Sequence, residues 1–136
     1  MYLNNEQKNR TIRHEVGHAI DYKYNRISCK GELGTALEID KLNILKNKEN
    51  ITKELKSKEY LEYAEISHII GGLTNNEISG RYKHSNNYWK RPNALEKETF
   101  ADLFAIAGGN DIKYLQIINR YLPNTLKAFD NLIRRI

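Results

Sequence analysis

The chain has 136 residues, 40% hydrophobic and 29% charged, which is ordinary for one soluble globular domain. Its single cysteine, Cys29, excludes an internal disulfide and a thiolate metal cluster, so a metal site would have to use histidine and carboxylate ligands. The net charge of +5 raises nucleic-acid binding as a hypothesis, but the 22 basic residues are interleaved with 17 acidic ones, which is typical of solvated helix faces.

The first half of the chain predicts a series of helices. In residues 5–24 apolar side chains recur at steps of three and four, which is typical of an amphipathic helix. These positions are Ile12, Val16, Ala19 and Ile20. Residues 36–48 repeat the helical pattern after a glycine-containing break. Asn50 or Thr52 then caps a helix through Lys58, and the next helix ends at the glycine pair 71–72.

The second half predicts a loop followed by three helices. Residues 73–92 are polar and rich in asparagine, and loops of this length are usually functional or disordered. A helix over 94–109 ends at a double glycine. Asn110 or Asp111 caps the next helix, and Pro123 lies near the start of the last. Because no β-hairpin signal is present, we expect a mainly α fold in one domain over residues 1–136.

The segment HEVGH, from His14 to His18, carries the clearest chemical signal. On a helix, residues at i and i+4 project from one face, so two imidazoles can converge on a metal ion about 2 Å from each nitrogen. Glu15 follows the first histidine and can act as a general base on a metal-bound water without binding the metal. Gly17 weakens the helix but lets another backbone approach closely. The alternative is two surface histidines on an amphipathic helix.

Asp21 is the nearest acid to this segment, but its position excludes it as the third ligand. It follows His14 by seven residues, which is roughly 10 Å along a helix axis. We expect Asp21 either to hydrogen-bond a ligand from outside the coordination sphere or to make a contact at the helix end.

Glu98 is the better candidate for the third ligand. It lies on a predicted helix whose apolar face packs inward, and Asp102 follows one turn later on the same side. Asp102 is therefore placed to accept the second ring N–H of His14 or His18. Glu96 is the alternative ligand, and the plain alternative is that these acids face solvent.

The segment HEVGHAIDY followed by EKETFADLFA resembles the gluzincin zinc metallopeptidases, which carry HExxH on one helix and a glutamate ligand on a later one. The sequence is most similar to peptidase domains of lethal-factor-type toxins and to peptidase-like domains of phage and prophage head-morphogenesis proteins. The resemblance extends from His14 to about Ile133. It implies a Zn²⁺ ion held by His14, His18 and Glu98, with Glu15 as the base.

The same resemblance implies that a tyrosine or histidine from the loop before Glu98 stabilises the oxyanion. Tyr88 is the first candidate and His84 the second, although either is equally consistent with an ordinary loop side chain. The resemblance also implies a zincin-like helical catalytic core. Zincins usually build a β-sheet before the HExxH helix, but only 13 residues precede His14. From the resemblance we therefore expect the sheet to be short or missing, and the chain to be either a reduced zincin or a piece of a longer protein.

These features predict a zinc-dependent endopeptidase that acts on a peptide or protein substrate. The alternative is a non-catalytic helical module of a phage or toxin protein, with zinc structural or absent. A basic helical nucleic-acid binder is a weaker hypothesis. The sequence carries no signal for a particular oligomeric state or cleavage specificity.

The sequence also bears on location. No apolar run approaches the roughly 18 to 20 residues that span a bilayer, and residues 1–10 lack the apolar core of a secretory signal. We therefore expect no membrane association, and either a cytoplasmic protein or delivery as part of a larger phage or secreted protein.

Overall fold

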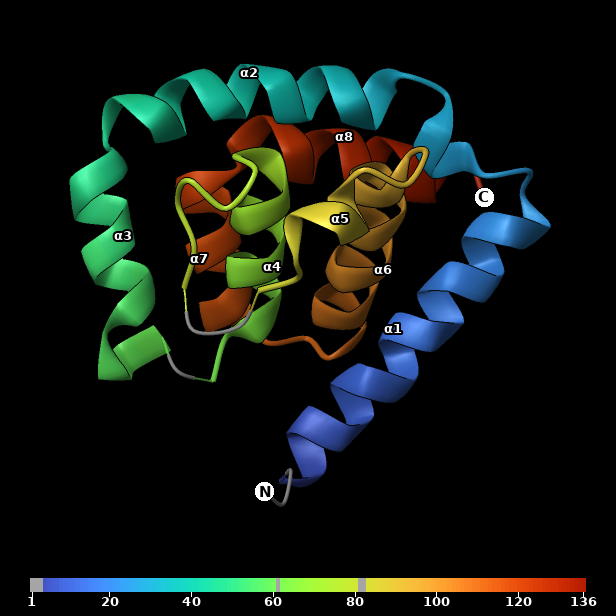
Figure 1. The fold of residues 1–136 in the computed structure, drawn as a ribbon. Helices are drawn as coiled ribbons and strands as arrows, with labels where there is room; N and C mark the ends of the chain where they lie inside the picture. The colour runs from blue at the N-terminus through green and yellow to red at the C-terminus, as the bar shows by residue number, and fades with distance from the viewer. Residues whose placement is uncertain (1–3, 61, 81–82) are drawn as a thin grey trace.

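The computed structural model describes residues 4–60, 62–80 and 83–136, which form eight α-helices and two short 3-10 turns (Figure 1). These ranges contain no β-strand, so the expected mainly α fold class is confirmed. The helices are α1 (Asn5–Lys23), α2 (Glu32–Lys46), α3 (Lys48–Lys56), α4 (Ala64–Leu73), α5 (Asn86–Trp89), α6 (Ala94–Gly108), α7 (Ile112–Tyr121) and α8 (Pro123–Arg134). Among the described residues, none of the helices combines the length and apolar character that crossing a bilayer requires.

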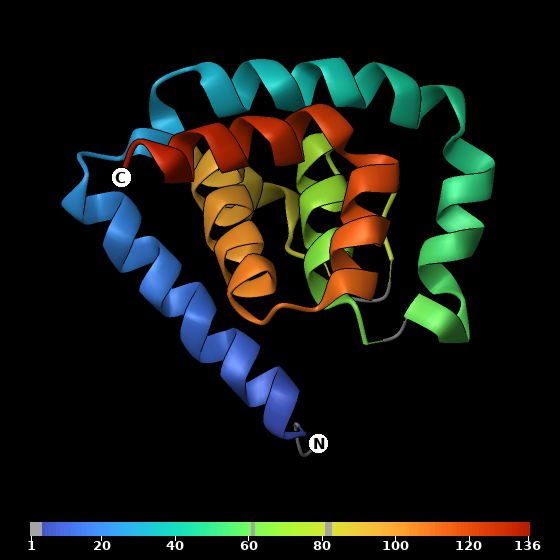
Figure 2. The ribbon, with the colours of Figure 1, turned by 180° about the vertical axis from the view of Figure 1, so that it is seen from behind.

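The helices α4, α6 and α7 run side by side, and α2 and α8 lie together across one end of them (Figure 1 and Figure 2). Fully buried side chains from α2, α4, α6, α7 and α8 fill the space between, including Leu33, Ile70, Phe100, Tyr114 and Phe129. The helix α3 closes one side, and α1 lies obliquely along the other, where it packs chiefly against α6. The α1–α6 contact therefore lies at the margin of the core.

Three predicted helix starts are confirmed, and for α7 and α8 the expected first-turn residues are confirmed as well. The α1 helix begins after Asn4, whose side chain accepts a hydrogen bond from Gln7 N at 2.8 Å while the Gln7 side chain accepts one from Asn4 N at 2.9 Å. Asp111, one of the two caps expected for α7, accepts from Tyr114 N at 3.0 Å. Pro123 occupies the first turn of α8, where its missing N–H costs nothing.

The prediction that α4 ends at its glycine pair is wrong. Gly71 and Gly72 lie within the helix, which continues to Leu73. A Cβ on Gly72 would lie 2.8 Å from the ring of Trp89. The glycine pair is therefore explained by the chain after α4, which packs closely on this helix.

Two further boundaries differ from the prediction. The α3 helix begins at Lys48, before the expected caps Asn50 and Thr52. The expected loop over 73–92 contains the short helix α5, capped by the Ser85 side chain, which accepts from Tyr88 N at 3.3 Å. Arg81 and Tyr82 of that loop lie outside the described residues.

Most of the apolar stripe of α1 faces away from the protein, and of its residues only Ile20 packs against the core. Ile12 is 62% exposed and Val16 44% exposed, whereas Arg10, Gly17 and Asp21 are buried. Polar contacts hold the inner side of this helix. The Arg13 side chain, for example, donates a hydrogen bond to the carbonyl of Ala105 in α6 at 2.7 Å.

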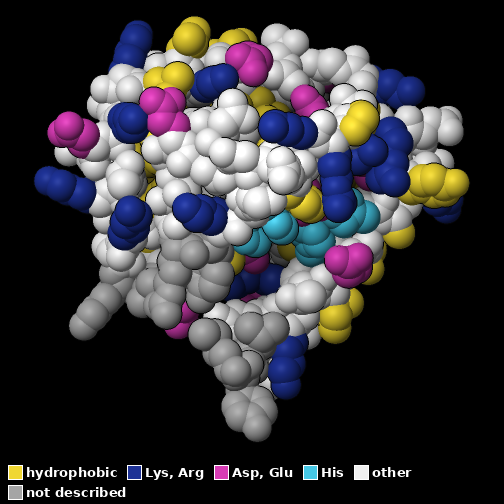
Figure 3. Space-filling model, in the orientation of Figure 1, with side chains coloured by type: hydrophobic (Ala, Val, Ile, Leu, Met, Phe, Trp, Pro, Cys, Tyr) yellow, Lys and Arg dark blue, Asp and Glu magenta, His cyan; other side chains and the backbone are white. Residues whose placement is uncertain are grey.

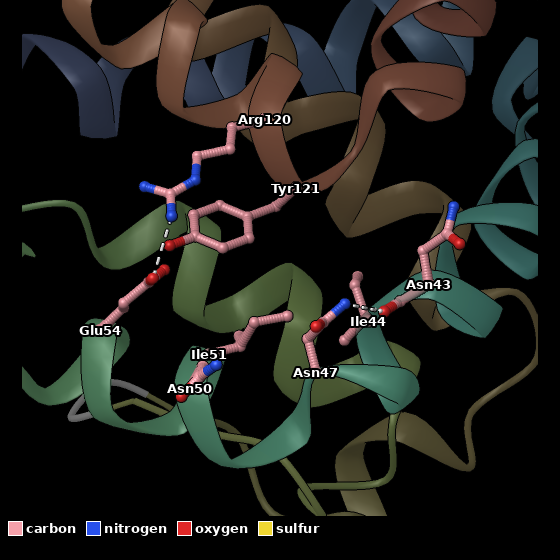
Figure 4. A pocket seen from close by; sticks show the side chains of 8 residues that line it. All are labelled: Asn43, Ile44, Asn47, Asn50, Ile51, Glu54, Arg120 and Tyr121. Atoms are coloured by element: carbon pink, nitrogen blue, oxygen red, sulfur yellow. Dashed lines mark hydrogen bonds and ion pairs between the residues drawn. The ribbon is translucent and has the colours of Figure 1, made fainter.

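A hollow of about 220 Å³ lies between α2, α3 and α7 (Figure 4). An ion pair closes one wall, with Arg120 Nη2 3.0 Å from Glu54 Oε1. Three asparagines, Asn43, Asn47 and Asn50, line the rest together with apolar side chains and Tyr121. None of the residues that the sequence identifies as candidate ligands or catalytic groups lines this hollow.

Candidate metal centre

The structure brings the three predicted ligands together between α1 and α6. His18 Nε2 lies 2.9 Å from Glu98 Oε1, and His14 Nε2 lies 3.3 Å from Glu98 Oε2. The two histidine Nε2 atoms are 3.1 Å apart. Within the described residues, this trio forms a group that could hold a metal ion.

The spacing and chemistry of these donors fit zinc. Donors about 2 Å from a tetrahedral ion lie roughly 3.3 Å from one another, and the observed separations of 2.9 to 3.3 Å are close to that value. Two imidazole nitrogens and one carboxylate form a set that suits Zn²⁺. Three protein donors would leave a fourth position for water or substrate.

Gly17 explains how the two helices come close enough for this arrangement. A Cβ at this position would lie 3.0 Å from Ala101 Cα and 3.0 Å from Phe104 Cβ, both in α6. Because glycine has no Cβ, the backbones can cross at short range. His14 and His18, one turn apart on the inner side of α1, then meet Glu98 of α6.

Asp102 lies behind the trio and contacts His14. Its Oδ1 atom is 2.8 Å from His14 Nδ1, and the carboxylate is buried, with only 1% of the residue exposed. An Nδ1–H that donates to this carboxylate leaves the lone pair of His14 Nε2 directed at the other two donors. Of the two histidines that the sequence left open as partners of Asp102, the structure places His14 beside it.

The charges in the site are strongly coupled when no metal is present. Burial by itself lowers the pKa of His14, but hydrogen bonds to Asp102 and Glu98 outweigh it and raise the pKa to about 10. Burial also acts to raise the pKa of Glu98, but hydrogen bonds from both histidines hold it well below its usual range. Burial raises the pKa of Asp102 to about 7 despite the contact with His14. The metal-free site therefore keeps a proton on His14 between two acids.

An open pocket of about 300 Å³ adjoins the trio. Glu15, Tyr88, His18 and Glu98 all contribute to its lining. Glu15 is exposed on α1. Burial and the neighbouring Glu98 carboxylate raise the pKa of the Tyr88 phenol, so Tyr88 remains a neutral hydrogen-bond donor.

The two residues expected to stabilise an oxyanion occupy different positions. Tyr88 lines the pocket, whereas His84 does not and stacks on the Tyr88 ring, with 3.9 Å between the ring centroids. Behind His84 lies His68 of α4, with ring centroids 5.0 Å apart. Burial and the nearby His84 lower the pKa of His68. The histidine side chains thus gather in one patch of the surface (Figure 3).

His68 was missed by the sequence analysis. It stands alone in an apolar helix, EISHII, with no partner at metal-ligand spacing. The one feature of the sequence that could have identified His68 was its position as a lone histidine among apolar residues.

The other acids considered as candidates lie away from the trio. The Asp21 carboxylate accepts hydrogen bonds from Ser28 N at 3.0 Å and Ser28 Oγ at 2.6 Å. This is a contact at the helix end, one of the two roles left open for Asp21. Glu96 faces Gly34 of α2, where its Oε1 would lie 3.4 Å from an added Cβ.

No protein-family model, curated protein or solved structure matches the chain. The resemblance to gluzincins therefore remains a hypothesis carried by the two motifs.

Proposed function

We propose that the protein is a zinc-dependent endopeptidase of the gluzincin type. The observation that carries this proposal is the position of Glu15, which lines the same pocket as two of the three donors, His18 and Glu98, but does not belong to the donor triangle. A structural zinc site is usually closed by four protein ligands, whereas a catalytic site has three and leaves an open position. A free carboxylate beside an open position is the arrangement that hydrolysis requires.

Each side chain then has a distinct task. Zinc, when bound, polarises the scissile carbonyl and lowers the pKa of a water molecule. Glu15 takes the proton of that water during attack and delivers it to the leaving amine. The Tyr88 hydroxyl donates a hydrogen bond to the developing oxyanion. Asp102 keeps His14 in the tautomer whose Nε2 is free to bind the metal.

The first experiment measures the metal content of the purified protein by mass spectrometry, with Glu98→Ala beside it. We expect about one zinc per chain in the wild type and less in the variant, because a three-ligand site loses one donor. Absence of zinc from the wild type after refolding with excess metal would contradict the proposal.

The second experiment separates catalysis from metal binding. A library of fluorescence-quenched peptides is incubated with the zinc-loaded wild type and with Glu15→Gln. The variant should keep its zinc and lose hydrolysis, since glutamine cannot carry the proton. Zinc in both proteins with no hydrolysis by the wild type would instead favour the non-catalytic helical module, and full hydrolysis by Glu15→Gln would exclude the role of Glu15.

A further inference from the structure

The pocket beside the proposed metal centre has a cationic wall. Arg26, Arg91 and Lys97 line it together with the acids Glu15 and Glu98. The three cations outnumber the two acids in this lining, and Glu98 would bind the metal in the proposed enzyme, so the lining is positive overall. Lysine and arginine side chains are visible next to the histidine patch in Figure 3.

Arg26 reaches this wall through an unusual backbone conformation. Asn25 and Arg26 have φ values of 58° and 54°, in the left-handed region that residues other than glycine rarely adopt. The turn is fixed by Arg26 N, which donates to the Asp21 carbonyl at 2.7 Å. The buried Asp21 carboxylate holds Ser28 on the other side of the turn. Strained backbone of this kind is tolerated where the surrounding structure fixes it, and it is common at functional sites.

The charges of the wall are poorly neutralised by the protein itself. Arg26 Nη1 lies 3.6 Å from Asp21 Oδ2, an oxygen that already accepts the Ser28 hydroxyl at 2.6 Å. The Arg91 guanidinium stacks over the Tyr88 ring, 5.0 Å from its centroid. In the part of the chain that the structure describes, no salt bridge joins Arg91 or Lys97 to a carboxylate.

We propose that Arg26, Arg91 and Lys97 form a subsite for a carboxylate of the peptide substrate, next to the bond that is cleaved. This inference rests on the proposed peptidase function and names its substrate class. Guanidinium and ammonium groups bind carboxylates through charge-assisted hydrogen bonds, which are stronger than neutral ones. The carboxylate belongs to an aspartate or glutamate side chain beside the scissile bond; the C-terminal carboxylate of a short substrate, cleaved within a few residues of its end, offers the same chemistry. A lysine or arginine at the same position would be repelled.

The test uses a cleaved peptide from the library, resynthesised with glutamate, glutamine or lysine at each position flanking the scissile bond and with an amidated C-terminus. At one of these positions kcat/KM should be higher for glutamate than for glutamine by on the order of tenfold, the value of one charged hydrogen bond. The glutamine peptide with a free C-terminal carboxylate forms a second arm. A gain in that arm alone identifies the chain end as the group that is recognised.

Charge variants connect the preference to the subsite. In Arg26→Gln/Lys97→Gln, and to a smaller degree in Lys97→Gln alone, the ratio of kcat/KM for the glutamate and glutamine peptides should fall towards one. Lys113→Gln, an exposed cation on α7 outside the pocket, is the control for net charge and should keep the wild-type ratio. Equal cleavage of all wild-type substrates, or a ratio unchanged in the double variant, would overturn the proposal.

A binding measurement separates failure of the subsite from failure of the peptidase proposal. Zinc-loaded Glu15→Gln is titrated into the same labelled peptides, and binding is followed by fluorescence anisotropy. If the wild type cleaves no library peptide, the library members that bind this variant take their place. Tighter binding of the glutamate peptide without cleavage by the wild type rejects the peptidase and supports the subsite. Cleavage by the wild type with no preference in either assay rejects the subsite and leaves the peptidase proposal intact.

Discussion

Replacing Gly17 by alanine tests whether the close crossing of α1 and α6 sets the geometry of the proposed metal site. The added Cβ would lie 3.0 Å from Ala101 Cα and 3.0 Å from Phe104 Cβ, whereas non-bonded carbons are most stable about 3.5–4.0 Å apart. The helices must therefore separate by roughly 0.5 Å. His14 moves with α1 and Glu98 with α6, so the ligand triangle expands by more than the roughly 0.2 Å that a metal site tolerates.

Two opposing effects decide the stability of this variant. Alanine is favoured over glycine in a helix interior by about 1 kcal/mol, whereas overpacking costs about 1–3 kcal/mol. The metal-free Gly17→Ala protein should therefore lose about 0–2 kcal/mol in its free energy of unfolding. The affinity for zinc should fall by at least about tenfold, as it does when the groups that position ligands are disturbed.

Gly34→Ala in α2 is the matched control. The atom nearest to its added Cβ is Glu96 Oε1 at 3.4 Å, at the end of a flexible side chain. This variant should gain up to about 1 kcal/mol from helix propensity and bind zinc as the wild type does. Urea unfolding followed by circular dichroism gives the stabilities, and competition with a chromophoric chelator gives the affinities. Wild-type zinc affinity in Gly17→Ala, together with a stability gain like that of the control, would refute the reasoning.

Three further predictions concern the site. Asp102→Asn removes the charge that fixes the His14 tautomer, so zinc affinity should fall by about 10–100-fold in the chelator assay; an unchanged affinity would show that the contact has no influence. Because the pKa of His14 is raised to about 10 in the metal-free protein, this residue is protonated at about pH 8, and zinc binding should release about one proton. Calorimetry in buffers of different ionisation enthalpy measures that release, and a heat independent of buffer would contradict it. Tyr88→Phe should lower kcat by about 100-fold or more at constant zinc content, and His84→Ala should lower it less. Steady-state kinetics measures both losses, and equal losses would argue against Tyr88 as the main residue that stabilises the oxyanion.

The trio of His14, His18 and Glu98 could be predicted to lie together because most of the signal is local. Helix periodicity alone brings the Nε2 atoms of His14 and His18 within 3.1 Å of each other, with no knowledge of the rest of the fold. Glu98 required one non-local step, namely that an acid on an inward-facing helix needs a partner. Glu98 was located correctly beside the histidines because Asp102, one turn further along the helix, lies on the same side.

The remaining parts of the site depend on tertiary structure that no short pattern encodes. His68 lies next to His84 because the segment between α4 and α5 packs back on α4. The glycine pair of α4 allows this close approach. Arg26 enters the pocket through a left-handed turn, and the sequence Asn25–Arg26 only permits that turn, since asparagine tolerates this conformation better than most residues. The buried Asp21, seven residues before Ser28, completes the turn, and no sequence pattern indicates Ser28 as its partner.

The orientation of α1 shows why hydrophobicity indicated the wrong face of this helix. Turning the helix to bury Ile12 and Val16 would gain at most about 1.5–3 kcal/mol for each side chain. The same rotation would separate Arg10 from Glu65, now 3.1 Å apart, and His14 from the buried Asp102. Breaking a buried charge pair costs about 3–5 kcal/mol, because the remaining charge stays without a partner. The two polar contacts therefore outweigh the apolar stripe, and the helix presents the side that carries His14 and His18 to α6.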